Sequence, residues 1–318
     1  AEYIGIKGST IQTIAGDPAN PIEGQVWYNS TTTVLKGSGK FISGGTWASG
    51  GAMNTARRRG VCSGIQTAAI AAGGYLSNAE TETYNGTAWT EVGDLNTGRD
   101  QGGNNFGTTL AALYASGAKA PWPTLTGEVE KWNGTAWTEV NNVNTARRNA
   151  AGAGTTTAAV LGAGGDPVKA NTETYDGTSW TETNDLNTAR MYVGSAGATS
   201  TAALCIGGSP TANVVEEFDG TSWSEKSNLT TPRSSMGGAG TSTAALAFGG
   251  DKPPYTAKTE SYDGSAWTEV ADLSTAIAQQ FGCGTSSLAL SAGGDTPPIT
   301  TASEEWSVGQ TTKTFTAT

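Results

Sequence analysis

The chain has 318 residues, of which 45 are glycine and 10 are tryptophan, and its formal net charge is −10 at pH 7. Glycine does not recur at every third position, which excludes a collagen-like chain, and charged side chains make up only 14% of the residues, which excludes charge-driven disorder. The acidic balance argues against a nucleic-acid partner, and no apolar run is long enough to predict membrane insertion.

Histidine is absent, and the three cysteines show no C-x-x-C spacing. The chain therefore lacks the commonest general base and the usual partner of a nucleophilic serine or cysteine. An odd number of widely spaced cysteines cannot form a complete disulfide framework, so we interpret Cys62, Cys205 and Cys283 as small core residues. We expect no cofactor, no metal site and no catalytic residues.

The first predicted element is an N-terminal arm, residues 1–44. Residues 16–21 form a turn-rich linker, and residues 25–29 and 34–36 are predicted to pair as a hairpin across 30–33. The stretch Gly-Gln-Val-Trp-Tyr-Asn-Ser-Thr-Thr at 24–32 resembles leader segments of tail-fibre and other virion proteins of tailed bacteriophages.

That resemblance implies that the arm anchors the chain to other virion proteins through Trp27 and Tyr28. It also implies a homo-oligomer within a larger assembly. The alternative is a hairpin that only packs on the rest of the chain. The chain opens Ala-Glu-Tyr, without the basic and then apolar start of a signal peptide. We therefore expect a virion protein made in the host cytoplasm.

After the arm comes a sixfold repeat over residues 45–306. Six tryptophans recur at intervals of 42 to 48 residues, and each is followed six residues later by an apolar residue. An arginine stands ten residues after each tryptophan except the last, where Ile277 replaces it. A Gly-Gly pair follows in every copy but the second, and then a glutamate two residues before an aromatic residue. The tryptophans are Trp47, Trp89, Trp137, Trp180, Trp223 and Trp267.

Each copy predicts four strands and no helix. Short apolar runs bounded by glycines are typical of buried strands, and Asp-Gly or Asn-Gly between the glutamate strand and the tryptophan strand predicts a tight hairpin. Four-stranded units repeating at about 44 residues are typical of a β-propeller, in which each blade buries its faces against its neighbours. We therefore predict an all-β fold: a six-bladed β-propeller of four-stranded antiparallel blades.

The two ends of the repeat predict how the ring closes. The Trp47 strand has no glutamate strand before it, and the strand of Glu304 and Trp306 has no tryptophan strand after it. The Trp47 strand is therefore expected to complete the last blade, leaving residues 307–318 as a C-terminal tail. The competing closure uses residues 313–316, which include Phe315, as the outer strand.

The order Gly-Gly, Glu-x-Tyr-Asp, Trp and Leu-x-Thr-Pro-Arg, clearest at 229–233, resembles the kelch repeat. The resemblance covers residues 45–306 and implies a six-bladed kelch-like propeller that serves mainly for binding. This sequence departs from the family pattern in its short Asp-Gly-Thr hairpin, in the lost glycine pair of copy two and in the lost arginine of copy six. The family resemblance leaves the ligand open.

The repeated charged residues have a structural and a functional interpretation. The arginines are expected to bond carbonyls or the repeated glutamates, with a basic ring for an anionic ligand as the alternative. The glutamates are expected to be structural too, although paired carboxylates also suit glycoside hydrolysis. Asp166, Asp251 and Asp295 follow glycine pairs and are interpreted as exposed turn formers, with a cation site as the alternative.

The loops after the glycine pairs predict where a partner binds. Successive connections of a blade alternate between the two faces of the disc, so these loops share one face with the connections that follow the tryptophan strands. From the last glycine to the glutamate the step is 8 residues at Gly74–Glu82, 10 at Gly250–Glu260 and 13 at Gly117–Glu130. Variable loops on a rigid scaffold often carry function, although these could simply cap the channel. The candidate binding residues are Tyr75, Asn78, Trp122, Pro123, Lys252, Pro254, Tyr255 and Pro298.

Together these features predict a non-enzymatic binding module of a phage virion. The expected protein is a tail-fibre or appendage protein whose propeller loops contact a host-surface glycan or protein. The alternatives are a capsid- or tail-decorating structural protein and a glycan-cleaving propeller enzyme.

Overall fold

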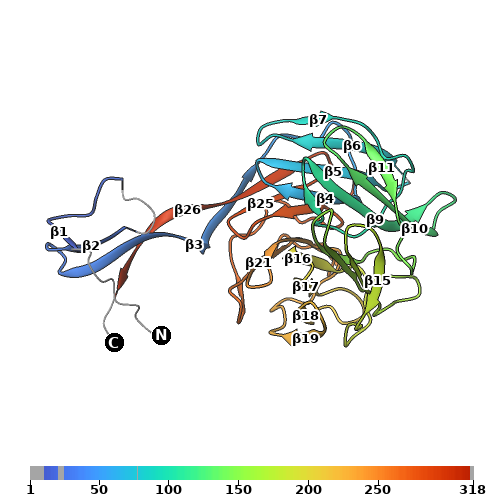
Figure 1. Cartoon of the computed structure of the whole chain (residues 1–318). Coiled ribbons are helices and arrows are strands. Elements are labelled where there is room, and N and C mark those ends of the chain that lie inside the picture. Colours follow the sequence, from blue (N-terminus) through green and yellow to red (C-terminus); the bar gives the residue numbers. More distant parts are fainter. Residues whose placement is uncertain (1–10, 21–24, 77, 316–318) are drawn as a thin grey trace.

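The computed structural model describes residues 11–20, 25–76 and 78–315, and all regular secondary structure in these residues is β-strand. The strands form one six-stranded sheet and five four-stranded sheets (Figure 1). Sheet 1 contains β4 (Val61–Ile65), β5 (Ala68–Gly74), β6 (Asn78–Tyr84) and β7 (Trp89–Glu91). Sheet 2 contains β8 (Gly107–Thr108), β9 (Ala111–Lys119), β10 (Thr124–Trp132) and β11 (Trp137–Val140).

The next three sheets follow in chain order. Sheet 3 contains β12 (Ala151–Gly154), β13 (Ala159–Gly162), β14 (Thr172–Tyr175) and β15 (Trp180–Thr183). Sheet 4 contains β16 (Gly194–Thr199), β17 (Ala202–Ile206), β18 (Val215–Phe218) and β19 (Trp223–Lys226). Sheet 5 contains β20 (Gly237–Thr241), β21 (Ala244–Phe248), β22 (Thr259–Tyr262) and β23 (Trp267–Glu269). All the strand pairs within these five sheets are antiparallel.

Sheet 6 is built from both ends of the chain. Its order is β1-β2-β3-β26-β25-β24, and its members are β24 (Phe281–Gly284), β25 (Leu288–Ala292), β26 (Ser303–Phe315), β3 (Val34–Ser49), β2 (Val26–Asn29) and β1 (Gln12–Ile14). Within it Trp47 of β3 lies opposite Trp306 of β26, in the register that other sheets give to their aromatic and tryptophan residues. The outer strand next to β26 is therefore the Trp47 strand.

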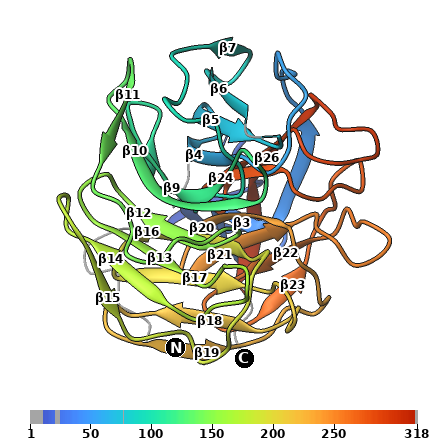
Figure 2. The same ribbon diagram turned by 90° about the vertical axis from the view of Figure 1, so that its right-hand side faces the viewer.

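The first strands of the sheets lie together at the centre of the molecule. Strand β4 packs against β24 and β8, and β20 packs against β16 and β24, which brings the last sheet against the first (Figure 2). A side chain would not fit there: a Cβ built on Gly238 would lie 2.3 Å from the Ser195 carbonyl oxygen, and one on Gly282 would lie 2.8 Å from the Gly237 Cα. This close approach explains why the inner strands are rich in glycine and alanine.

A hydrophobic cluster fills the space between every two consecutive sheets, including sheets 6 and 1. Each cluster contains the aromatic–tryptophan pair of the later sheet, as Tyr84 and Trp89 show between sheets 6 and 1. The ring centroids in these pairs lie 4.9–5.6 Å apart, within the range of favourable aromatic contacts. The all-β prediction of repeated four-stranded antiparallel sheets is confirmed, and their arrangement is consistent with a β-propeller.

All three cysteines are free and fully buried. Burial is the main reason that the pKa of the Cys62 and Cys205 thiols lies above the ordinary value. The interpretation of the cysteines as small core residues is confirmed.

The six sheets together form a body that we call the disc. The two central strands of sheet 6, β3 and β26, continue beyond the disc as a ribbon (Figure 1). Past an irregularity between Val308 and Gln310, β26 pairs with β3 until Phe315 lies opposite Leu35. Strand β2 adds antiparallel to β3, with Asn29 opposite Val34, and β1 adds parallel to β2. We call residues 11–20, which include β1, together with β2, residues 34–44 of β3 and residues 310–315 of β26 the arm. The resemblance at 24–32 and the alternative closure at 313–316 each rest partly on a residue outside the described ones, Gly24 and Thr316.

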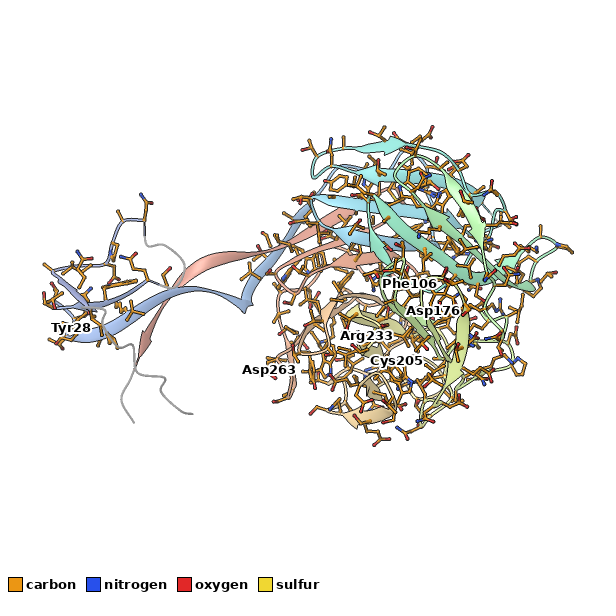
Figure 3. All side chains as sticks on the ribbon, viewed as in Figure 1. Tyr28, Phe106, Asp176, Cys205, Arg233 and Asp263 are labelled. Atoms are coloured by element: carbon orange, nitrogen blue, oxygen red, sulfur yellow. The ribbon has the colours of Figure 1, made fainter. Side chains whose placement is uncertain are left out.

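Asp17 holds the described part of the arm together. Its Oδ1 accepts hydrogen bonds from the Trp27 indole at 3.1 Å and from Asn29 Nδ2 at 2.7 Å. Its Oδ2 lies 2.7 Å from Lys36 Nζ, and the hydrogen bonds from Lys36 and Asn29 are the main causes that lower the pKa of Asp17. Trp27 is fully buried, so it packs inside the arm. Tyr28 beside it is partly exposed (Figure 3).

The disc has two unlike faces. On the turn face lie the connections between first and second strands and between third and fourth strands. A representative turn has Gly177 at φ +95°, with Asp176 Oδ1 accepting the backbone N–H groups of Thr178 and Ser179 at 2.8 Å each. On the loop face lie the other connections. In sheet 6 the third and fourth strands, β26 and β3, run on into the arm where the other sheets turn, so the arm leaves from the turn face.

Candidate binding face

The candidate site is the loop face, which Figure 2 views with the arm behind the disc. Beneath its surface lies a repeated ion pair. In five sheets the repeated arginine and glutamate are both almost completely buried and lie together, as Arg233 does inside the disc (Figure 3). The pairs are Arg57–Glu82 at 2.8 Å, Arg99–Glu130 at 3.1 Å, Arg190–Glu216 at 3.0 Å, Arg233–Glu260 at 3.3 Å, and Arg147–Glu173. The structural interpretation of these residues is confirmed, and the five arginines do not form an exposed basic ring.

The same glutamates also hold the connection that enters each sheet. Glu82 Oε2 accepts hydrogen bonds from the backbone N–H of Asn54 at 2.8 Å and from its Nδ2 at 2.9 Å. The Asn54 amide also donates to the Trp89 carbonyl. Asn96, Asn144 and Asn187 repeat this arrangement, and Thr230 uses its hydroxyl in sheet 5. These asparagines were not predicted, although they recur at a fixed seven residues after the tryptophans.

A ring of six residues surrounds the axis on the loop face. Each stands two positions after the repeated arginine, or after Ile277, and each has a positive φ of 54–64°. Backbone hydrogen bonds link them around the axis: Gln101 N–H donates to Arg59 O at 2.6 Å, and Arg59 N–H donates to Gln279 O at 2.9 Å. The ring consists of Arg59, Gln101, Asn149, Tyr192, Ser235 and Gln279. We call it the mouth ring, and its side chains differ from sheet to sheet.

Below the mouth ring the channel narrows. Residues of the ring line a cavity of about 60 Å³, which has room for a few water molecules. Asn105 crosses the channel from sheet 2, where its Nδ2 donates to the Ser195 carbonyl at 3.0 Å and lies 3.1 Å from the Ser195 hydroxyl. A ligand larger than a few waters would therefore lie over the mouth, against the loops.

Cations and aromatic rings gather over sheets 1–3. The guanidinium of Arg58 lies 4.4 Å from the centroid of the Tyr75 ring, and that of Arg59 lies 5.1 Å from it. The Arg148 guanidinium lies 5.1 Å from the Trp122 ring. Trp122 is 44% exposed, at the tip of the β9–β10 hairpin that projects away from the arm (Figure 1). We call these five residues the arginine–aromatic patch.

Asp100 is a buried carboxyl beside this patch. Neither of its oxygens has a hydrogen-bond partner in the described part of the chain. Burial raises the pKa of Asp100 to about 6, although Arg59, the Trp122 side chain and Arg148 act in the opposite direction. The equivalent position is arginine in sheets 1 and 3, so this carboxyl breaks the repeat.

Four of the remaining predicted binding residues lie over sheets 5 and 6. Pro254 and Tyr255 line one side of an open pocket of about 570 Å³, and Pro297 lines the other. Lys252, Pro254 and Pro298 are exposed, as is Pro123 beside Trp122. Asn78 is the first residue of β6, where its Oδ1 accepts the Glu80 N–H at 2.6 Å. The structure thus places the eight candidates in two groups, one over sheets 1 and 2 and one over sheets 5 and 6.

The three aspartates after glycine pairs are not simply exposed turn formers. Asp295 is only 7% exposed, forms an ion pair with Arg58 and accepts a hydrogen bond from the Tyr255 hydroxyl at 2.9 Å. Asp166 lies 2.6 Å from Arg148, while Asp251 pairs with Ser234 through its backbone. Asp295 therefore connects the two groups of binding residues. Within the described ranges, no three His, Cys, Asp or Glu side chains are placed to hold a metal ion.

No protein-family model matches the chain, and no curated protein resembles it significantly. In the described residues no helix is long and apolar enough to cross a membrane.

Proposed function

We propose that this chain is a non-enzymatic binding module of a tailed-phage virion, a tail-fibre or appendage protein that contacts the host surface. In this proposal the six sheets are the blades of a closed, kelch-like ring. The arm attaches the subunit to other virion proteins, and the loop face binds a host glycan or protein. The N-terminal resemblance is the ground for the virion assignment.

One observation carries the proposal: the features that break the repeat lie on the face opposite the arm. The arm leaves the turn face, where Asp-Gly or Asn-Gly turns are nearly alike. The loop face carries the mouth ring, the arginine–aromatic patch and loops of unequal length. A subunit fixed by the arm thus presents its irregular face outward.

The chemistry of the patch favours a ligand with anionic groups and flat or ring-shaped surfaces. Tyrosine, tryptophan and arginine are the residues that contribute most to binding energy at interfaces. Arg59, which is partly exposed and forms no ion pair within the described residues, supplies hydrogen-bond donors, and Trp122 and Tyr75 supply flat apolar surfaces. An acidic surface polysaccharide has both features. Display of many copies would convert weak single contacts into firm attachment.

The test is binding of the full chain to host cells and to surface polysaccharide extracted from them. Trp122→Ala is expected to weaken binding at least tenfold, as loss of a dominant contact does. Leu110→Ala is the matched control, because Leu110 is also a large exposed apolar residue but lies in the β8–β9 turn on the opposite face. Equal binding by both variants, or no binding by the unaltered chain, would remove the support for this function.

A capsid- or tail-decorating protein is the second candidate, and the arm supports it equally well. Electron cryo-microscopy of the intact particle separates the two. An outward, uncovered loop face fits host contact, whereas a loop face buried against neighbouring subunits fits decoration.

A glycan-cleaving enzyme is the third candidate, and Asp100, the buried carboxyl beside the arginine–aromatic patch, is the residue at which we would test for a general acid. Turnover of host polysaccharide that Asp100→Asn abolishes would establish that function instead.

A further inference from the structure

The sixth copy of the repeat contains a cavity where the other five hold a guanidinium group. Ile277 stands in the arginine position of this copy, while the repeated glutamate is retained as Glu304. A cavity of about 360 Å³ lies between the connection that enters sheet 6 and the loop before Glu304. Neither the propeller fold nor the proposed host contact requires this cavity.

Sheet 4 shows how the complete site is built. The Arg190 guanidinium lies 3.0 Å from Glu216 Oε1 and donates to the Val214 carbonyl at 2.7 Å. It also lies 3.4 Å from the carbonyl of Cys205, which faces Glu216 across the sheet. In sheet 4 one carboxylate and two carbonyls thus surround the guanidinium, and each of the other four arginines keeps the carboxylate and one of these two carbonyls.

Sheet 6 keeps these three acceptors. Glu304 corresponds to Glu216, and Ala302 stands two residues before it, as Val214 does before Glu216. Ser291 faces Glu304 across the sheet, as Cys205 faces Glu216. All three residues line the cavity.

Ile277 follows the path of the arginine stem but is too short to reach the acceptors. A Cβ built on Gly294 would lie 2.9 Å from Ile277 Cδ1, and one built on the equivalent Gly250 would lie 3.3 Å from Arg233 Cδ. The isoleucine therefore replaces the aliphatic part of the arginine and leaves the guanidinium position to the cavity.

The surroundings suit a polar cation. Glu304 Oε2 accepts the Ser274 N–H at 2.8 Å, and within the described ranges no lysine or arginine forms an ion pair with Glu304. The exposed residues Ala52, Ser274 and Thr275 connect the cavity with solvent. Hydroxyl groups line the rest of it, from Ser49, Ser291, Thr296, Thr300, Thr301 and Ser303.

We propose that this cavity binds an alkylguanidinium group, such as an arginine side chain of a partner or a small guanidinium compound. The group would donate hydrogen bonds to the Glu304 carboxylate and to the Ser291 and Ala302 carbonyls, as Arg190 does to the equivalent acceptors of sheet 4. A hydrogen bond between charged groups is about twice as strong as a neutral one, and the cavity has the size of ordinary ligand pockets. This site is separate from the arginine–aromatic patch, and the inference does not depend on the proposed function.

The experiment is isothermal titration of the full chain with ethylguanidinium chloride, with tetramethylammonium chloride as the ionic control. The unaltered chain is expected to bind ethylguanidinium saturably. Glu304→Gln is expected to weaken binding at least tenfold, because it removes the charged acceptor. Glu305→Gln is the matched control: it removes the same charge from the next residue, which contacts Tyr84 and Gln66 instead of the cavity.

A second variant fills the cavity from within. Ile277→Arg is expected to abolish ethylguanidinium binding and to raise the thermal midpoint, because it restores the pair present in five other sheets. If Ile277→Arg does not fold, the comparison of Glu304→Gln with Glu305→Gln tests the proposal by itself. Absence of saturable binding by the unaltered chain, or binding that both Glu304→Gln and Ile277→Arg leave unchanged, would overturn the proposal.

The source of the guanidinium group is read from a third titration. Binding of the peptide acetyl-Gly-Arg-Gly-amide as tightly as ethylguanidinium supports an arginine of a protein partner. Binding of ethylguanidinium alone supports a small-molecule ligand.

Discussion

The interior between the sheets and the mouth ring on the loop face follow opposite rules. Between the sheets, the same arginine, glutamate, asparagine and tryptophan contacts recur, with a few losses, around the ring. Around the mouth, equivalent positions carry arginine, glutamine, asparagine, tyrosine and serine on an almost identical backbone. Because the repeated interior contacts hold the sheets together, the side chains of the mouth ring can differ, and contact a ligand, without loss of the fold.

The largest effect expected from breaking this pattern is in the interior. Arg190→Leu leaves the Glu216 carboxylate buried without its cation, which is expected to lower the free energy of unfolding by about 3–5 kcal/mol. Ile277→Leu is the matched control, because the sixth copy has no ion pair to lose, and its cost should stay below about 1.5 kcal/mol. Urea unfolding measures both. Similar losses in the two variants would contradict a stabilising role for the repeated ion pair.

A smaller effect is expected at the mouth, from Asp100. Its pKa of about 6 in the folded protein exceeds the ordinary value of 3.8, so the folded state keeps a proton that the unfolded state loses. Its contribution to stability is therefore complete below about pH 4 and is lost as the pH rises through 6. Relative to Asp100→Asn, the unaltered chain should lose roughly 1–3 kcal/mol of unfolding free energy between pH 4 and pH 7.

Urea unfolding across this pH range tests the prediction for Asp100. Asp185→Asn removes the same charge from an exposed position and serves as the control. Parallel pH curves for the unaltered chain and Asp100→Asn would show that Asp100 ionises normally.

The smallest expected effect comes from restoring, in two sheets, a hydrogen bond between tryptophan and a hydroxyl group that four other sheets form. Four outer tryptophans donate their indole N–H to a hydroxyl of the preceding sheet, as Trp137 does to Thr81 at 3.0 Å. Trp180 and Trp267 have no partner in the described structure, because valine occupies the corresponding positions, Val129 and Val215.

Val129→Thr and Val215→Thr are each expected to raise the free energy of unfolding by about 1 kcal/mol, by supplying the missing acceptor. Val160→Thr, a change at another buried valine, should destabilise the protein because the new hydroxyl replaces a methyl group inside an apolar cluster. Thermal unfolding of the three variants measures the difference. Destabilisation in all three would show that the hydroxyls of the other sheets contribute no useful bond to tryptophan.

Much of the fold could be predicted from periodicity. The interval between tryptophans, the Asp-Gly turns and the aromatic residue after each glutamate are local signals, and they predicted four antiparallel strands per copy. The second copy was harder to interpret, because Ser116 and Gly117 adopt the positive φ values of the missing glycine pair and the strand continues to Lys119. A glycine pattern alone could not reveal that backbone.

The candidate site was predictable only in part. Loop length and proline content identified Trp122 and Tyr255 as loop-face residues, but Arg58, Asp100 and Arg148 have no signal in a single sequence. The contacts of these residues in the fold identify them as parts of the site: Tyr75 lies beside Arg58, Trp122 lies beside Arg148, and Asp100 is buried. The Trp122–Arg148 contact joins sheets 2 and 3, and the Tyr75–Arg58 contact brings together segments on either side of β4 and β5, so both depend on the tertiary structure.

The amino-acid sequence by itself determined the repeating unit, since alternating small and aromatic residues, with glycines at the turns, fix strands and hairpins within each copy. Only the tertiary structure decided which differences between copies come together. Packing of each sheet against the next gathered single residues from six copies around one axis. The tertiary structure also places the arm on the turn face, opposite the mouth ring on the loop face. It leaves a cavity in sheet 6, where Ile277 stands in the position of the repeated arginine.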